Sequence, residues 1–286
     1  MDDPAIIFSE RLTLLIISLI LGGCISLVGW RNGFYHIPAY DERQNNIAGA
    51  LVFKAFAIFF GIWLLFVPAL YHLFDLFVQN PELDLALRTW MNLIGVIIAA
   101  VCFWFFFRSL TVGEKQAVMG AKWKKHPLFT CLIGCSIWFV AYPWVIATGQ
   151  LIEIIFHLLG VKPHADQLAV QHLKDIIDKP WLFFPMATAV ILIIPFLEEL
   201  LFRGFIQTWL KPLIGRKSAI LLSSVIFACF HFSSEQKIGN VELLVSLFVF
   251  SCYLGFVKEK LESLWGSVAL HSTFNCISIL VLILFS

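Results

Sequence analysis

Charged residues are scarce in this sequence. Of its 286 residues, 14% are charged and 60% are hydrophobic, whereas soluble globular domains carry about 25% charged residues. Several apolar runs also exceed the roughly 18 consecutive residues that mark a transmembrane helix. The composition therefore excludes a soluble domain and predicts an all-α fold, that of a polytopic membrane protein.

The sequence also lacks a large net charge and two kinds of processing signal. Its formal net charge is +1, which argues against nucleic acid as a partner. The first residues, MDDPAIIFSE, are acidic and no small-residue cleavage site follows, so we expect a membrane anchor rather than a removed signal peptide. The last residues, VLILFS, lack the cysteine of a prenylation motif, so we do not expect the chain itself to be lipidated.

Two hydrolase signatures are absent as well. The sequence contains no GxSxG nucleophile elbow and no HExxH zinc-protease motif. The seven cysteines all fall within apolar runs, where we expect them to pack as small hydrophobic residues without forming disulfides. Cys131 and Cys135 share a helix face, but no second pair accompanies them, so packing is favoured over a metal half-site. A covalent serine or cysteine mechanism therefore has little support.

Apolar runs separated by polar, proline- or glycine-bearing connections predict about eight transmembrane helices. Each run is close to the roughly 20 residues that a bilayer core requires. We divide the chain into a three-span N-terminal scaffold at residues 1–127 and a helical core at residues 128–286, treated together as one membrane domain. The predicted spans are residues 12–30, 55–77, 90–108, 128–156, 181–209, 218–233, 241–257 and 264–284.

Lysine and arginine are unevenly distributed over the connections between these spans. The first, third, fifth and seventh connections carry thirteen of them, and the other side carries six. The positive-inside rule therefore places the odd-numbered connections in the cytosol and both termini outside. On that outer side, the segment at residues 161–180 mixes apolar and charged residues at helical spacing, which predicts an amphipathic surface helix.

Three ionisable residues interrupt the apolar run PFLEELLFRGFIQTW at residues 195–209. An ionisable side chain at bilayer depth costs roughly 2.5 to 3.5 kcal/mol on insertion scales, so three together indicate a function. Glu199 and Arg203 stand four residues apart on one helix face and are predicted to form an ion pair. Glu198 is rotated by about 100° around the helix axis from Glu199, so the ion pair does not use it and it stays available for another role. Pro195 is expected to loosen the preceding turn and to leave carbonyl groups unsatisfied beside the carboxylates.

Polar side chains also interrupt two later spans. His231 lies in the sixth predicted span, and His271 and Asn275 lie four residues apart on one face of the eighth. At a rise of about 1.5 Å per residue, these groups and Glu198 fall at similar depths in the bilayer. We therefore expect them to meet.

Together these groups predict a hydrolytic site. A carboxylate held in apolar surroundings is a competent general base for a water molecule, and a nearby histidine can hold that water or pass on its proton. Side-chain donors from His271 and Asn275 could stabilise the oxyanion that forms on an attacked carbonyl.

The three motifs resemble those of the CAAX protease and bacteriocin-processing (CPBP) family, in its type II CAAX prenyl endopeptidase group. EExxxR is present as Glu198, Glu199 and Arg203, FxxxH as Phe227 and His231, and HxxxN as His271 and Asn275. The resemblance covers about residues 181–284.

The resemblance implies an intramembrane endopeptidase in which Glu198, aided by His231, activates the attacking water. His271 and Asn275 would form the oxyanion site, and Glu199 and Arg203 would be a structural ion pair. No cofactor is favoured, because an amide suits an oxyanion site better than a zinc shell. The alternative is a zinc-dependent metalloendopeptidase with Glu198, His231 and His271 as metal ligands.

The expected partners are membrane lipid and a peptide or membrane-protein substrate, with or without a prenyl group. The active site is expected to open toward the cytosolic side. Two other classes stay open: a non-catalytic membrane scaffold or immunity protein, and an ion-coupled transporter, against which the lack of an internal repeat argues. The sequence specifies neither the substrate nor the oligomeric state.

Overall fold

The fold consists entirely of helices in the residues that the structure describes. The structure is a computed structural model of the chain and describes residues 4–38, 46–75, 80–161 and 168–285. Within them 87% of the chain is helical and no strand occurs, which confirms the predicted all-α class. The helices are α1 (Pro4–Arg31), α2 (Gly49–Phe60), α3 (Val67–Asp75), α4 (Pro81–Ser109), α5 (Val112–Met119), α6 (Pro127–Leu158), α7 (Leu168–Ile176), α8 (Pro180–Thr188), α9 (Ile194–Glu199), α10 (Thr208–Ile214), α11 (Arg216–Phe230), α12 (Gly239–Leu261) and α13 (Leu264–Phe285).

Short segments of π-helix join several of these helices into longer rods. Gly61–Phe66 links α2 to α3, Ala189–Ile193 links α8 to α9, and Leu200–Gln207 links α9 to α10. A π-helix bonds each amide to the carbonyl five residues earlier; it is rare in proteins and frequently lies at functional sites. Two of the three π-helical segments lie in the span that carries Glu198 and Glu199.

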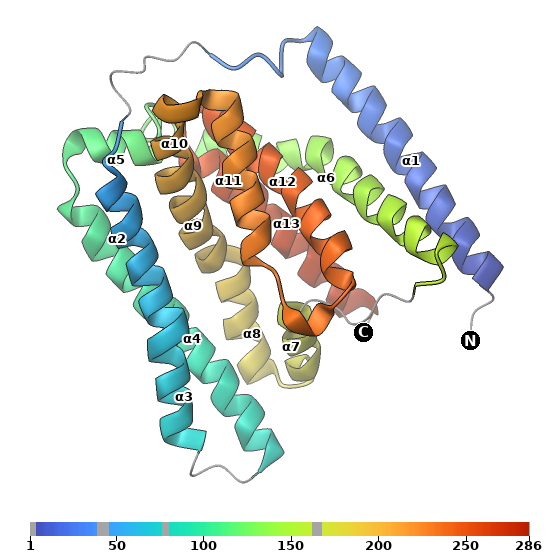
Figure 1. The fold of residues 1–286 in the computed structure, drawn as a ribbon, viewed down its shortest axis with the longest axis horizontal. Helices are drawn as coiled ribbons and strands as arrows, with labels where there is room; N and C mark the ends of the chain where they lie inside the picture. Colours follow the sequence, from blue (N-terminus) through green and yellow to red (C-terminus); the bar gives the residue numbers. More distant parts are fainter. Residues whose placement is uncertain (1–3, 39–45, 76–79, 162–167, 286) are drawn as a thin grey trace.

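Seven helical rods of the described chain are long and apolar enough to cross a membrane, which confirms a polytopic membrane protein. The predicted sixth span, residues 218–233, is instead the 15-residue helix α11. At about 1.5 Å per residue it falls short of the roughly 30 Å hydrocarbon core. Helix α11 and the short 3₁₀ turn that follows it, Ser234–Gln236, nevertheless carry the chain from α10 to the opposite end of the bundle, where α12 begins (Figure 1).

The odd-numbered connections meet at one end of the bundle, shown uppermost in Figure 1. The Lys260 ammonium donates to the backbone carbonyls of Gly33 and His36, Arg216 donates to the Pro38 carbonyl, and Lys122 pairs with Glu262. The opposite end contains the start of α1, the end of α13 and helix α7 (Figure 1). The bundle thus has a basic end and an end that carries α7.

Close helix crossings hold the later helices together. At the crossing of α6 and α13, a β-carbon on Gly134 would lie 2.4 Å from the Gly266 carbonyl oxygen, so only glycine fits there. Helix α1 packs along α6, where the Trp144 indole donates to Ser26 at 2.9 Å. This contact crosses the predicted boundary at residue 127, and the division into scaffold and core stays a prediction.

The positive-inside rule predicts which end of the bundle faces the cytosol. In a cysteine-free background, a membrane-impermeant maleimide should label Asp178→Cys, just after α7, in intact cells. It should label Lys124→Cys, in the third connection, only after permeabilisation. Both positions are exposed, so the contrast reports sidedness rather than burial. The opposite labelling pattern would show that the basic end lies outside.

Candidate active site

The span that carries the two carboxylates has an irregular backbone. Within Ala189–Ile193 the amides bond five residues back, and Ile194 donates to the Ala189 carbonyl. The next residue in this register is Pro195, which has no N–H for the Val190 carbonyl. The Asn275 side chain on α13 fills that gap, because its Nδ2 donates to the Val190 oxygen at 2.8 Å. Proline thus leaves a carbonyl open, as expected, on a residue that lines the same cavity as Glu198, and Asn275 satisfies it.

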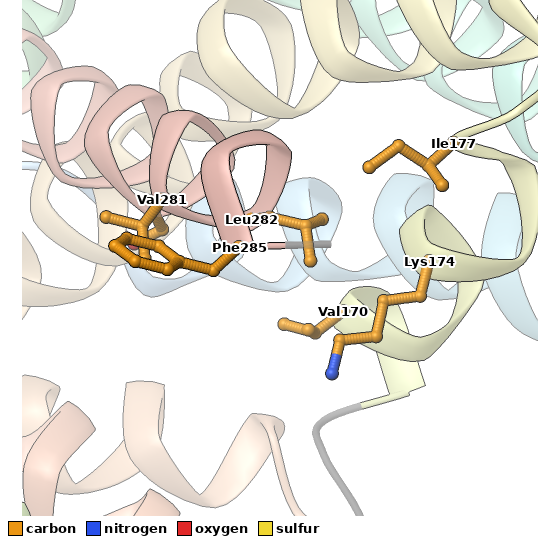
Figure 2. A pocket seen from close by; sticks show the side chains of 7 residues that line it. Val170, Lys174, Ile177, Val281, Leu282 and Phe285 are labelled. Carbon is orange, nitrogen blue, oxygen red and sulfur yellow. The ribbon is translucent and has the colours of Figure 1, made fainter.

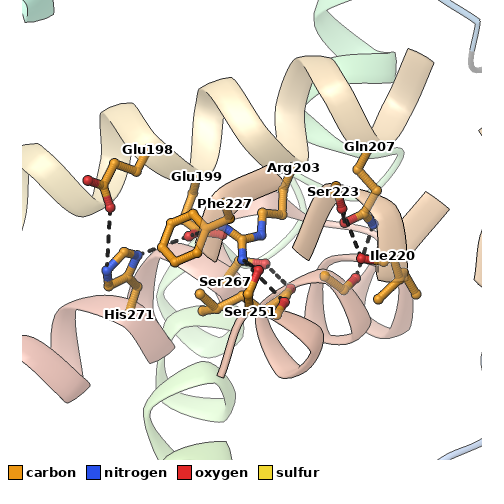
Figure 3. Close-up of polar contacts among 12 residues, drawn as sticks. Glu198, Glu199, Arg203, Gln207, Ile220, Ser223, Phe227, Ser251, Ser267 and His271 are labelled. Atoms are coloured by element: carbon orange, nitrogen blue, oxygen red, sulfur yellow. Dashed lines mark hydrogen bonds and ion pairs between the residues drawn. The ribbon is translucent and has the colours of Figure 1, made fainter. Parts of the chain in front are cut away.

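Glu199 and Arg203 form an ion pair in the interior of the protein. Their side chains are fully buried, and Nη1 of Arg203 lies 2.9 Å from Oε1 of Glu199. The second terminal guanidinium nitrogen, Nη2, donates to the Ser251 hydroxyl at 2.6 Å and to the Ser251 carbonyl at 3.2 Å. The guanidinium carbon also lies 4.4 Å from the centroid of the Phe227 ring. Arg203 is therefore held by α11 and α12 as well as by Glu199 (Figure 3).

His271 lies between the two carboxylates. Its Nδ1 is 2.9 Å from Glu199 Oε1, and its Nε2 is 3.7 Å from Glu198 Oε2 (Figure 3). Because a carboxylate can only accept, the hydrogen-bond network assigns a proton to Nδ1. The sequence predicted Glu199 as the partner of Arg203 only. Its contact with His271 joins residues 72 positions apart, and no spacing pattern in the sequence signals it.

His231 ends α11 and faces the same region. Its backbone amide bonds to the Ala228 carbonyl, three residues back, which leaves the Phe227 carbonyl to the imidazole Nδ1 at 2.9 Å. The Phe227 and His231 rings also pack against each other, with centroids 4.7 Å apart. This local geometry explains why the two residues are spaced by four. Since Nδ1 donates to a carbonyl, the neutral imidazole keeps a lone pair on Nε2.

One cavity of about 260 Å³ brings the predicted site residues together. Within the described chain, no hydrogen bond connects His231 or Asn275 directly to Glu198, so the cavity is what they share. Helix α7, which lies outside the candidate membrane spans, borders the cavity. The polar residues that line it are Glu198, His231, His271, Asn275 and Ser278, and the apolar ones are Ala169, Val170, Leu173, Val190, Ile194, Phe227, Leu247, Phe250, Phe274, Ile279 and Leu282.

The position of α7 bears on two of the sequence expectations. Residues of α7 and α13 line the cavity, and α7 and the end of α13 lie at the end of the bundle where α1 begins (Figure 1). An opening at that end would be on the same side as the termini. The external termini and the cytosolic opening both stay predictions.

The residues of the zinc alternative do not form a metal-binding cluster as placed. Across the described ranges, no group of three His, Cys, Asp or Glu side chains has the spacing to hold a metal ion. Glu198, His231 and His271 line the cavity, and Nδ1 of each histidine bonds to a protein group, so only the Nε2 atoms could bind a zinc ion.

Comparison with known proteins finds one family model that matches the region of the site. Residues 180–277 match the family model described as "Type II CAAX prenyl endopeptidase Rce1-like". This match confirms the resemblance seen in the three motifs and covers all of them. The searches of curated proteins and of solved structures gave no match.

Breaking the buried ion pair should destabilise the protein. Arg203→Met would remove the guanidinium that Glu199 faces and leave one buried negative charge uncompensated, at a cost of about 3 to 5 kcal/mol. The control is Lys122→Met, because the exposed Lys122–Glu262 pair should be worth at most about 1 kcal/mol. Unfolding in mixed micelles measures both. Equal stability of the two variants would show that the buried pair is not structural.

Proposed function

We propose that this protein is an intramembrane endopeptidase that hydrolyses a peptide bond with a water molecule activated by Glu198. The observation that carries the proposal is the placement of Glu198 beside His271, at 3.7 Å, on a cavity that His231 and Asn275 also line. The family match over residues 180–277 supports a protease. Its substrate is a peptide or membrane protein, with or without a prenyl group.

Glu198 is the general base in this mechanism. Its side chain is 19% exposed, so water reaches it, while Glu199 next to it is fully buried. Glu198 takes a proton from the water, whose oxygen attacks the carbonyl carbon of the substrate. The lone pair on His231 Nε2 accepts a hydrogen bond that orients the water. When the C–N bond breaks, the protonated Glu198 returns its proton to the leaving amine.

His271 and Asn275 stabilise the oxyanion. With Nδ1 donating to Glu199, His271 can donate from Nε2 only as an imidazolium. Two carboxylates and two cations then balance, because Glu198 and Glu199 offset Arg203 and His271. Asn275 gives one amide hydrogen to Val190 and offers the other to the oxyanion.

The side of the membrane on which the substrate enters is part of the proposal. The Lys- and Arg-rich connections lie at the end of the bundle opposite α7 (Figure 1). The positive-inside rule therefore favours a cavity that opens away from the cytosol.

Replacing Glu198 should abolish cleavage. Glu198→Gln keeps the shape and removes the base, so the rate should fall by about 10² to 10⁴. Purified protein in liposomes is incubated with a quenched fluorescent peptide, farnesylated or unmodified, and with membrane proteins whose new termini are read by mass spectrometry. The control is Glu235→Gln, an exposed carboxylate in the turn before α12. Undiminished cleavage by Glu198→Gln would exclude this mechanism.

Removal of metal should leave the activity unchanged. The same assay is run after treatment with 1,10-phenanthroline, and bound zinc is measured by mass spectrometry. A glutamate mechanism needs no ion, so activity should persist within experimental error. Stoichiometric zinc whose removal stops turnover would instead establish the zinc alternative, with Glu198, His231 and His271 as the first ligands to replace.

A further inference from the structure

Helix α7 forms one wall of the catalytic cavity. Ala169, Val170 and Leu173 line the same cavity as Glu198 and His231. Helix α7 is outside the seven candidate membrane spans and precedes the span that carries the carboxylates. The sequence predicted a surface helix here, but not its contact with the site.

Packing fixes α7 against the membrane-spanning helices. Leu173 and Ile176 are buried and pack in a cluster with Phe183 of α8 and Ile279 of α13. The His172 imidazole also lies 3.1 Å from the Thr89 hydroxyl on α4, through its Nε2. These contacts reach three spans, so α7 presents its apolar residues to the cavity at a defined position.

A second groove, mostly apolar, adjoins the cavity and lies between α7 and the end of α13 (Figure 2). Its volume is about 520 Å³. Val170, Ser278 and Leu282 line both the groove and the cavity and therefore stand at their junction. The other residues of the groove are Lys174, Ile177, Val281 and Phe285.

The cavity is too small to hold a whole substrate. Its volume of about 260 Å³ is below the roughly 300 to 1,000 Å³ of pockets that enclose drug-sized ligands. It can accept the side chains beside the bond to be cut, while the flanking part of the substrate has to lie outside. The groove adjoins the cavity and has a mostly apolar lining, which suits an extended apolar segment of the substrate.

We propose that Val170 and Leu282 are specificity-determining residues, which select the substrate by the size of the apolar side chain next to the bond that is cut. This inference rests on the proposed endopeptidase function. The occupant of the groove is an extended apolar peptide segment that passes between the two side chains into the cavity. Apolar contacts of this kind discriminate by about 10 to 200-fold for one methylene or a similar small group.

The test compares cleavage of three quenched peptides that carry Ala, Leu or Trp beside the cleaved bond. In Val170→Phe, kcat/KM for the Trp peptide should fall at least about tenfold more than for the Ala peptide. Val170→Ala and Leu282→Ala should shift the preference toward the larger side chains. The control is Leu284→Ala, which removes an exposed leucine of α13 outside both linings and should leave the preference unchanged.

A change of all three peptides by one common factor would overturn the inference and leave the protease function standing. A second measurement does not depend on turnover. In Glu198→Gln, a peptide with a diazirine on its apolar side chain should cross-link to residues 168–176 or 278–285, and Val170→Phe should reduce this at least threefold. Cross-links elsewhere would overturn the assignment. Cross-linking here without cleavage by the unmodified protein would instead count against the endopeptidase.

Discussion

The candidate site depends on the hydrogen bonds that the Glu199 carboxylate accepts. Its Oε1 accepts from both Arg203 and His271, at 2.9 Å each, so a single buried atom fixes residues from two helices. Isolated, this charge would be costly in a membrane interior. Paired with a guanidinium that Ser251 and Phe227 also hold, it becomes a rigid acceptor. The orientation of His271 toward Glu198 follows from this arrangement.

Departures from regular helix geometry leave backbone carbonyls without their usual partners, and side chains of the site bind these carbonyls. A regular helix satisfies its own backbone and offers nothing at bilayer depth. Here the π-helical register and Pro195 leave the Val190 carbonyl open, and Asn275 binds it. Likewise, α11 ends inside the bundle because its last carbonyls are taken by His231. The cavity therefore lies where two helices depart from ideal geometry.

Spacing rules predict contacts within one helix and miss those that depend on packing. The Glu199–Arg203 contact follows from a separation of four residues, and the open carbonyl near Pro195 follows from the missing N–H. The partners of these groups on α12 and α13 could not be predicted, since they depend on how helices cross. Hydropathy gave residues 218–233 as a span because α11 is apolar, but it does not detect that His231 ends the helix early. The position of α7 as a wall of the cavity could not be predicted either, because it depends on tertiary contacts.

The two ends of the bundle are held together by different kinds of contact. At the basic end, the buried Lys258 ammonium donates to the Arg203 carbonyl at 2.5 Å and to the Thr208 hydroxyl at 2.6 Å. It thereby stabilises the π-helical segment that carries Arg203. Glu259 beside it pairs with Lys211 at 3.1 Å. This network makes the basic end costly to open, because separating buried charges is unfavourable. Around the cavity, α7 is held by apolar packing of Leu173 and Ile176 against Phe183 and Ile279. Under the proposed function, a substrate that enters there meets apolar contacts and leaves this charge network in place.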